Sequence, residues 1–215
     1  IYDSPDHLGT FGVRQNAREV AIKAPLKLWW DQVSVPRLAK REALDIVYNP
    51  KLSIPLWTKS KTVLVMHGGE QFAIPHTFQW WDRIYFTIAN KLYCKKATAI
   101  ISMTQIGAGD IVRYMNADSA KIKVIHEAYN KECRLLTTEE TATVKIRHGL
   151  PDRYILFVGG FNPRKNLGNL LRAYSVVKDT WPHDLVIVGF KRWKYAQDFK
   201  LIEELGLQDR VHTIG

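Results

Sequence analysis

The sequence predicts an α/β protein with two lobes, each built on a parallel β-sheet. Three observations support this prediction: short apolar runs recur along the chain, amphipathic stretches separate several of them, and one polar stretch interrupts the alternation. The apolar runs are rich in β-branched residues and continuous, which is typical of parallel strands buried on both faces. Strand followed repeatedly by helix indicates βαβ units.

Seven runs are predicted to be strands. They are Asp45–Tyr48, Thr62–Met66, Thr98–Ser102, Ile122–Ile125, Tyr154–Val158, Asp184–Val188 and Val211–Ile214. Apolar residues at helical spacing predict amphipathic helices between several of them. These rows are Trp81, Ile84, Tyr85, Ile88 and Leu92, then Leu167, Leu170, Leu171, Tyr174 and Val177, then Phe199, Ile202 and Leu205. The tryptophan pairs Trp29–Trp30 and Trp80–Trp81 are interpreted as packing residues of the core and the domain surface rather than as a ligand platform.

The polar stretch Thr137–Glu140, together with the following Gly149-Leu150-Pro151, indicates the connection between the lobes. We therefore expect a first domain over residues 1–133, a linker with room for a short helix over 134–152, and a second domain over 153–215. The second domain should contain a sheet of about three strands. With 215 residues and 46% hydrophobic side chains, the chain can bury a core.

The net charge of +10 favours anionic partners such as nucleotide phosphates, nucleic acid or an acidic membrane surface. A nucleic-acid partner is disfavoured because the charge is spread along the chain instead of forming a basic helix with interleaved aromatic residues. Cys94 and Cys133 are far apart and lack ligand-like spacing, so we expect a reduced, cytoplasmic protein without structural zinc. Neither an apolar run of eighteen residues nor a signal-peptide pattern is found in the sequence.

The strongest chemical signal follows the strand Tyr154–Val158. Two glycines allow close backbone approach, a helix N-terminus offers free N–H groups, and a lysine adds charge. We interpret this turn as a phosphate site formed by Gly159, Gly160, Arg164, Lys165 and Asn166, with a tight turn carrying solvated basic residues as the alternative. Gly189, after the next strand, reaches the same sheet edge, where ligands of α/β proteins gather.

In the first lobe, His67 follows the strand Thr62–Met66, at the end where an open α/β sheet places catalytic or substrate-contacting residues. A structural histidine is the alternative. Glu70 is either a carboxylate partner or a solvated loop residue. Thr104 is interpreted first as a helix N-cap, with ligand contact as the second option.

Group 1 (family four) retaining glycosyltransferases carry motifs that this sequence resembles in both lobes. In the second lobe the matching runs are Tyr154–Leu167 (YILFVGGFNPRKNL), Leu170–Tyr174 (LLRAY) and Asp184–Gly189 (DLVIVG). In the first lobe they are Pro36–Lys40 (PRLAK), Asp45–Pro50 (DIVYNP), Thr62–His67 (TVLVMH), Ala99–Thr104 (AIISMT), Asp110–Ile111 and Lys121–Ile125 (KIKVI). The resemblance spans roughly Leu28 to Gly215.

The resemblance implies the GT-B architecture of two Rossmann-like domains, here both partial, with catalysis in the cleft between them. A nucleotide-sugar donor would be held mainly by the C-terminal domain, and a sugar or lipid-linked acceptor would approach from the N-terminal one. Lys165 matches the lysine that contacts the donor diphosphate, and His67 matches the histidine near the transferred sugar, so these two are the expected catalytic residues. Thr104 falls where the family often has a serine. Neither a metal nor a cofactor is expected.

The sequence also departs from the family. Gly160 stands where many members carry a second phosphate-binding arginine, which leaves Lys165, with Arg164 beside it. The family's acidic motif is missing, so we expect an inactive fragment of a retaining glycosyltransferase, cytoplasmic or peripheral to the inner face of the membrane. A nucleotide-sugar epimerase or a non-catalytic nucleotide-sugar-binding protein of the same fold is the alternative.

Overall fold

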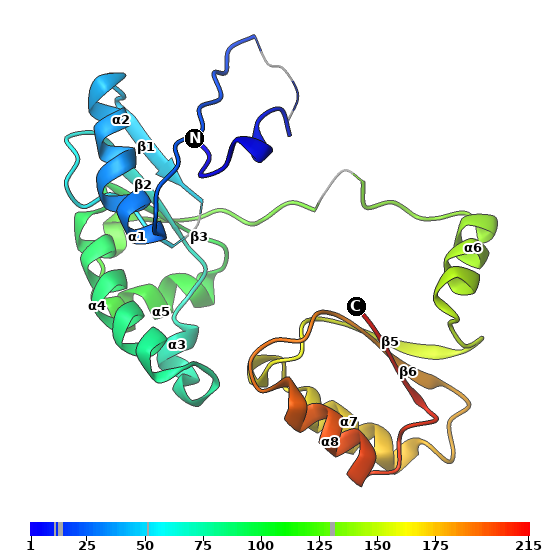
Figure 1. Cartoon of the computed structure of the whole chain (residues 1–215). Helices are drawn as coiled ribbons and strands as arrows, with labels where there is room; N and C mark the ends of the chain where they lie inside the picture. Colours follow the sequence, from blue (N-terminus) through cyan, green and yellow to red (C-terminus); the bar gives the residue numbers. More distant parts are fainter. Residues whose placement is uncertain (11, 13–14, 51, 130–131) are drawn as a thin grey trace. The chain divides into compact units, whose positions relative to one another are not determined.

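A computed structural model describes residues 1–10, 12, 15–50, 52–129 and 132–215. The chain divides into two compact units, Ile1–Ala128 (unit 1) and Tyr129–Gly215 (unit 2), as coloured along the sequence in Figure 1. Each unit has its own parallel sheet, of four strands in unit 1 and three in unit 2. The prediction of two lobes with separate sheets is confirmed.

Unit 1 is a parallel sheet in the order β1-β2-β3-β4, with helices before β1, between β2 and β3, and between β3 and β4. Its elements are η1 (Pro5–His7), α1 (Lys27–Trp29), η2 (Trp30–Ser34), α2 (Val35–Arg41), β1 (Ile46–Asn49), β2 (Lys61–Met66), α3 (Glu70–Ala73), η3 (Pro75–Thr77), α4 (Trp80–Lys96), β3 (Ala99–Ser102), α5 (Gln105–Met115), η4 (Ser119–Lys121) and β4 (Ile122–Val124). The core is built around the central strands, where Leu64, Met66 and Ile100 are fully buried. This burial explains their continuous apolar sequences.

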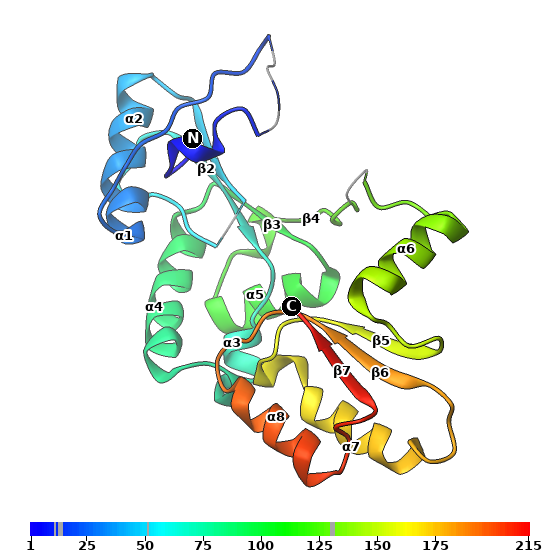
Figure 2. The ribbon, with the colours of Figure 1, turned by 45° about the vertical axis from the view of Figure 1, so that its right-hand side comes forward.

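Unit 2 is a parallel sheet in the order β5-β6-β7. Its elements are α6 (Thr138–His148), β5 (Tyr154–Val158), η5 (Pro163–Lys165), α7 (Leu167–Val177), β6 (Asp184–Val188), α8 (Tyr195–Glu204) and β7 (Val211–Ile214). Figure 2 shows α7 and α8 side by side against this sheet. Leu171 and Leu185 are fully buried in the core they share. All seven predicted strands form, with ends within one residue of the expected ones.

The segment expected as a linker, 134–152, contains α6 and is grouped with unit 2. The division falls between Ala128 and Tyr129, ahead of the expected end of the first domain at residue 133, and residues 130 and 131 lie outside the described part. A capping box starts α6: Thr137 Oγ1 accepts from the Glu140 amide, and the Glu140 carboxylate accepts from the Thr137 amide. These bonds satisfy amides at the start of a helix that has no fully buried residue.

Helix α4 packs differently from what its sequence suggests. Its buried residues are Ala89, Asn90, Tyr93 and Cys94, whereas the apolar row at helical spacing faces away from the core. The members of that row, Trp81, Ile84, Tyr85, Ile88 and Leu92, are exposed, and the preceding Trp80 is 65% exposed. The expectation of core packing is therefore wrong for Trp80 and Trp81, because α4 contributes Ala89, Tyr93 and Cys94 to the core instead. Packing on the domain surface stays a prediction for this pair. No helix among the described residues is both long enough and apolar enough to cross a membrane.

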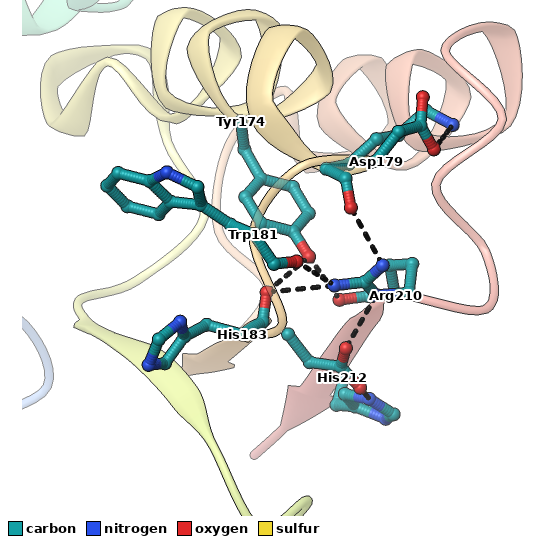
Figure 3. A network of polar contacts seen from close by, with 8 residues as sticks. Tyr174, Asp179, Trp181, His183, Arg210 and His212 are labelled. Carbon is teal, nitrogen blue, oxygen red and sulfur yellow. Dashed lines mark hydrogen bonds and ion pairs between the residues drawn. The ribbon is translucent and has the colours of Figure 1, made fainter.

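A polar network closes the amino-terminal edge of the unit 2 sheet (Figure 3). Arg210 donates to the Asp184 carboxylate at 2.6 Å and to the carbonyl oxygens of Lys178, Trp181 and His183. His212 Nε2 lies 2.7 Å from the other Asp184 oxygen. Burial alone would raise the pKa of Asp184, but the hydrogen bonds from His212 and Arg210 hold it below its ordinary value. This network lies at the opposite end of the strands from the candidate phosphate turn.

Candidate functional site

Three glycines lie in a row at the carboxyl edge of the unit 2 sheet. The strand register places Gly159 beside Gly189, and Gly189 beside Gly215. A Cβ atom at residue 189 would overlap the Gly159 carbonyl oxygen and lie 2.6 Å from its carbonyl carbon. Gly189 is therefore required by the close approach of two backbones, in addition to any role in binding a ligand.

The turn after β5 is fixed to the loop after β6 by its own backbone. Phe161 is fully buried, its N–H donates to the Phe190 carbonyl at 3.0 Å, and its carbonyl accepts from Arg192 N–H at 3.2 Å. Asn162 Nδ2 donates to the Gly160 carbonyl at 3.1 Å. The glycine turn is thus a rigid connection between two strand ends.

Lys165 approaches this turn from the end of η5, just before α7 begins. Its Cδ atom lies 3.8 Å from the position that a Cβ on Gly159 would occupy, so its aliphatic stem runs beside the glycine while the residue remains exposed. Asn166 adopts a left-handed conformation with φ 56° and precedes α7, which has no side-chain cap at its N-terminus. The lysine, the glycines and an uncapped helix start are therefore brought together, as the phosphate interpretation requires. Arg164 is exposed on the same short helix, η5.

Arg192 is a cation at this turn that the sequence reasoning missed. Its Cγ atom lies 3.3 Å and its Nε atom 3.7 Å from the Cβ position of Gly160. The sequence could not predict this contact, because Arg192 is far from Gly160 along the chain and comes close to it only when β5 pairs with β6. On the other side of the α7 start, Asp198 Oδ1 lies 4.0 Å from the Cβ position of Gly168, and burial raises the pKa of Asp198.

In unit 1, His67 follows directly after β2, and 47% of its side chain is exposed. Its Nδ1 atom lies 3.9 Å from the Glu127 carboxylate, which belongs to the segment after β4. Sequence reasoning missed Glu127, although β2 and β4 are parallel and end at the same edge of the sheet. Glu70, for which a carboxylate partner and a solvated loop residue were the two alternatives, is exposed at the start of α3.

The start of helix α5 packs against the loop that contains His67. Thr104 is its N-cap, with Oγ1 accepting from the Gly107 amide at 2.9 Å, so the first interpretation of Thr104 is confirmed. A Cβ atom at Gly107 would lie only 2.8 Å from the His67 carbonyl oxygen and 2.8 Å from Ser102 Oγ. The absence of a side chain at residue 107 lets α5 pack directly under the loop that presents His67.

The outward face of α4 forms a shallow apolar groove of about 480 Å³. Its lining is aromatic and aliphatic and includes Trp81, Tyr85 and Ile88 from α4, with Leu28 and Leu56 from neighbouring segments. This groove was not predicted as a site, because a row of apolar residues on a helix is normally buried in the core.

Sequence relatives of this chain are glycosyltransferases. O-antigen chain mannosyltransferase RfbU of Salmonella typhimurium (strain LT2) is 27% identical over 160 residues, which cover 74% of this chain and 40% of that protein. A D-inositol 3-phosphate glycosyltransferase of Streptomyces scabiei is 34% identical over 90 residues, which cover 41% of this chain and 20% of that protein. The chain thus matches less than half the length of these curated relatives. No protein-family model matches it.

Comparison with solved structures identifies the fold. The crystal structure of Anabaena Alr3699/HepE in complex with UDP-glucose aligns with a TM-score of 0.65 at 18% identity, covering 85% of this chain and 50% of HepE. A glycosyltransferase structure from Rickettsia africae ESF-5 aligns with a TM-score of 0.60 at 17% identity, covering 95% of this chain and 54% of that one. The chain therefore has an α/β fold of the GT-B type, and in sequence it is similar to mannosyltransferases and other glycosyltransferases.

Proposed function

We propose that this chain belongs to a glycosyltransferase that moves a sugar from a nucleotide sugar to an acceptor with retention of anomeric configuration. The observation that carries the proposal is the pair of glycines at the end of β5, with Lys165 beside Gly159 and the uncapped start of α7 next to it. This arrangement offers charge and backbone N–H groups to a diphosphate. The mannosyltransferase and glycosyltransferase relatives, and the UDP-glucose bound by a structural neighbour, support the same chemistry.

In the proposed reaction, the bond between the sugar C1 and the β-phosphate oxygen breaks, and its electron pair stays on that oxygen. The acceptor hydroxyl oxygen forms the new bond to C1, and its proton passes to the departing nucleoside diphosphate. Lys165 stabilises the negative charge that accumulates on the diphosphate. His67, exposed at the carboxyl end of β2, contacts the transferred sugar. The proposed reaction includes no resident cofactor, as the family resemblance implies, and the nucleotide sugar is the donor substrate.

The test is product analysis with the protein at its natural length. UDP-glucose and a mannosyl nucleotide are each supplied with and without sugar and lipid-linked acceptors, and the anomeric configuration of the product is read by NMR. Acceptor-dependent release of nucleoside diphosphate with a retained anomer supports the proposal. An epimerised nucleotide sugar formed without acceptor would instead identify an epimerase, and binding without turnover would identify a non-catalytic nucleotide-sugar-binding protein.

We further propose that the outward face of α4 gives this protein its contact with a membrane surface, from which a lipid-linked acceptor is supplied. Aromatic side chains with a polar edge, such as Trp80 and Trp81, are suited to the boundary between lipid and water. The same part of the chain is basic, with an excess of five positive charges between residues 51 and 100. An apolar face combined with positive charge favours an anionic bilayer.

Co-sedimentation with vesicles tests this contact. The chain should bind phosphatidylglycerol vesicles more strongly than phosphatidylcholine vesicles, and Trp81→Ser should weaken the binding. Trp57→Ser is the matched control, because Trp57 is exposed but lies outside α4. Equal loss from both substitutions, or no binding to either vesicle, would contradict the membrane contact.

A further inference from the structure

The loop between β6 and α8 carries three cations, and their side chains take different directions. Lys191 Nζ lies 4.9 Å from the centroid of the Phe199 ring, and Lys194 Nζ lies 4.6 Å from that of the Trp193 ring. Both ammonium groups are thus placed over aromatic faces. Arg192 is the cation of this loop that lies against the glycine turn.

The position of Arg192 is set by backbone bonds at the strand ends. Its N–H donates to the Phe161 carbonyl at 3.2 Å, while Phe161 N–H donates to the Phe190 carbonyl at 3.0 Å. The side chain then lies against Gly160, and a Cβ atom at residue 160 would make a tight contact of 3.3 Å with Arg192 Cγ. Gly160 therefore makes room for Arg192 at the carboxyl edge of the sheet.

We propose that Arg192 is a second phosphate-contacting residue, which together with Lys165 holds the diphosphate of the nucleotide sugar at the Gly159–Gly160 turn. The proposal rests on the proposed function. The two side chains flank adjacent glycines, Lys165 at Gly159 and Arg192 at Gly160. Among the residues that the structure describes, no carboxylate forms an ion pair with either of them.

The chemistry of the leaving group favours two cations. A nucleotide sugar carries two negative charges on its diphosphate, and the charge increases when the sugar departs. A guanidinium offers several N–H donors in a fixed plane that matches phosphate oxygens, whereas an ammonium acts as a point charge. Arg192 and Lys165 are therefore complementary contacts, and Arg192 would orient the diphosphate as well as neutralise it.

The test is a titration of the 215-residue chain with inorganic pyrophosphate, followed by NMR after selective ¹⁵N labelling of its 13 glycines. Pyrophosphate should shift the amide signals of Gly159 and Gly160 but not that of Gly206, which lies in the turn after α8. Arg192→Ala should raise the half-saturating concentration about tenfold, as expected for loss of a partly exposed charged hydrogen bond. Arg192→Lys should recover part of the loss.

Lys194→Ala is the matched control, because it removes a cation of the same loop that lies over Trp193; its effect should stay within about twofold. An unchanged melting temperature and glycine spectrum for each variant shows that the fold is intact. If Arg192→Ala behaves like Lys194→Ala while Lys165→Ala still weakens binding, the assignment of Arg192 fails and the phosphate site remains. If pyrophosphate shifts no glycine signal of the unsubstituted chain, the phosphate site itself fails.

Discussion

Gly189→Ala should destabilise unit 2, because the backbone next to residue 189 leaves no room for a methyl group. The new Cβ atom would overlap the Gly159 carbonyl oxygen and lie 3.0 Å from the Gly160 amide nitrogen. This overlap can be relieved only if the ends of β5 and β6 move apart. That movement would weaken the hydrogen bond that Gly159 N–H donates to the Val188 carbonyl at 2.9 Å. Overpacking costs about 1–3 kcal/mol and the weakened ladder bond about 1 kcal/mol more, so we expect a loss of roughly 3 kcal/mol.

For a unit of this size, 1 kcal/mol corresponds to a change in Tm of about 4–8 °C, so a loss of roughly 3 kcal/mol should lower Tm by about 12–24 °C. Circular dichroism gives the melting curve, and hydrogen exchange of the β5 to β7 amides assigns the loss to unit 2. Gly168→Ala is the matched control: its Cβ would make an ordinary 3.6 Å contact with Leu201, and alanine favours the helix. A Tm for Gly189→Ala within about 3 °C of the unsubstituted protein would refute the steric argument.

Three further predictions concern the site and its support. In the protein at its natural length, Lys165→Ala should lower the transfer rate about ten- to a thousandfold and weaken donor binding less, with a smaller effect for Arg164→Ala; equal small effects in steady-state kinetics would place the phosphate site elsewhere. Thr104→Ala should cost about 1 kcal/mol in a urea titration by removing the α5 N-cap, and Thr104→Ser should restore most of it; equal losses would contradict a capping role. Because the folded pKa of Asp184 is depressed, its contribution is fully present above the ordinary carboxyl pKa near 3.8 and is lost as the pH falls through the folded value. Asp184→Asn should therefore flatten the dependence of Tm on pH below about 4, and an unchanged acid slope would exclude this network as its source.

The local sequence pattern was sufficient to predict the strands and the glycine turn after β5. Buried parallel strands need continuous β-branched runs, and the glycines before a helix are visible within a few residues of each other, so Gly159, Gly160 and Lys165 could be proposed together. Thr104 was predicted as a cap for the same reason, because a cap and the amide it bonds are three residues apart. The roles of these residues in binding remain predictions.

The tertiary structure decided what depends on contacts between distant parts of the chain. Pairing of β5 with β6 brings Arg192 to Gly160 and fixes Gly189 against Gly159, and the parallel ends of β2 and β4 bring Glu127 to His67. The sequence also could not show which face of α4 is buried. Periodicity indicates that a helix has an apolar face, but it does not show which part of the protein, if any, covers that face. The sequence alone determined the elements and the local turn, whereas sheet pairing determined which charges meet there, since side chains far apart in sequence become neighbours only when strands align.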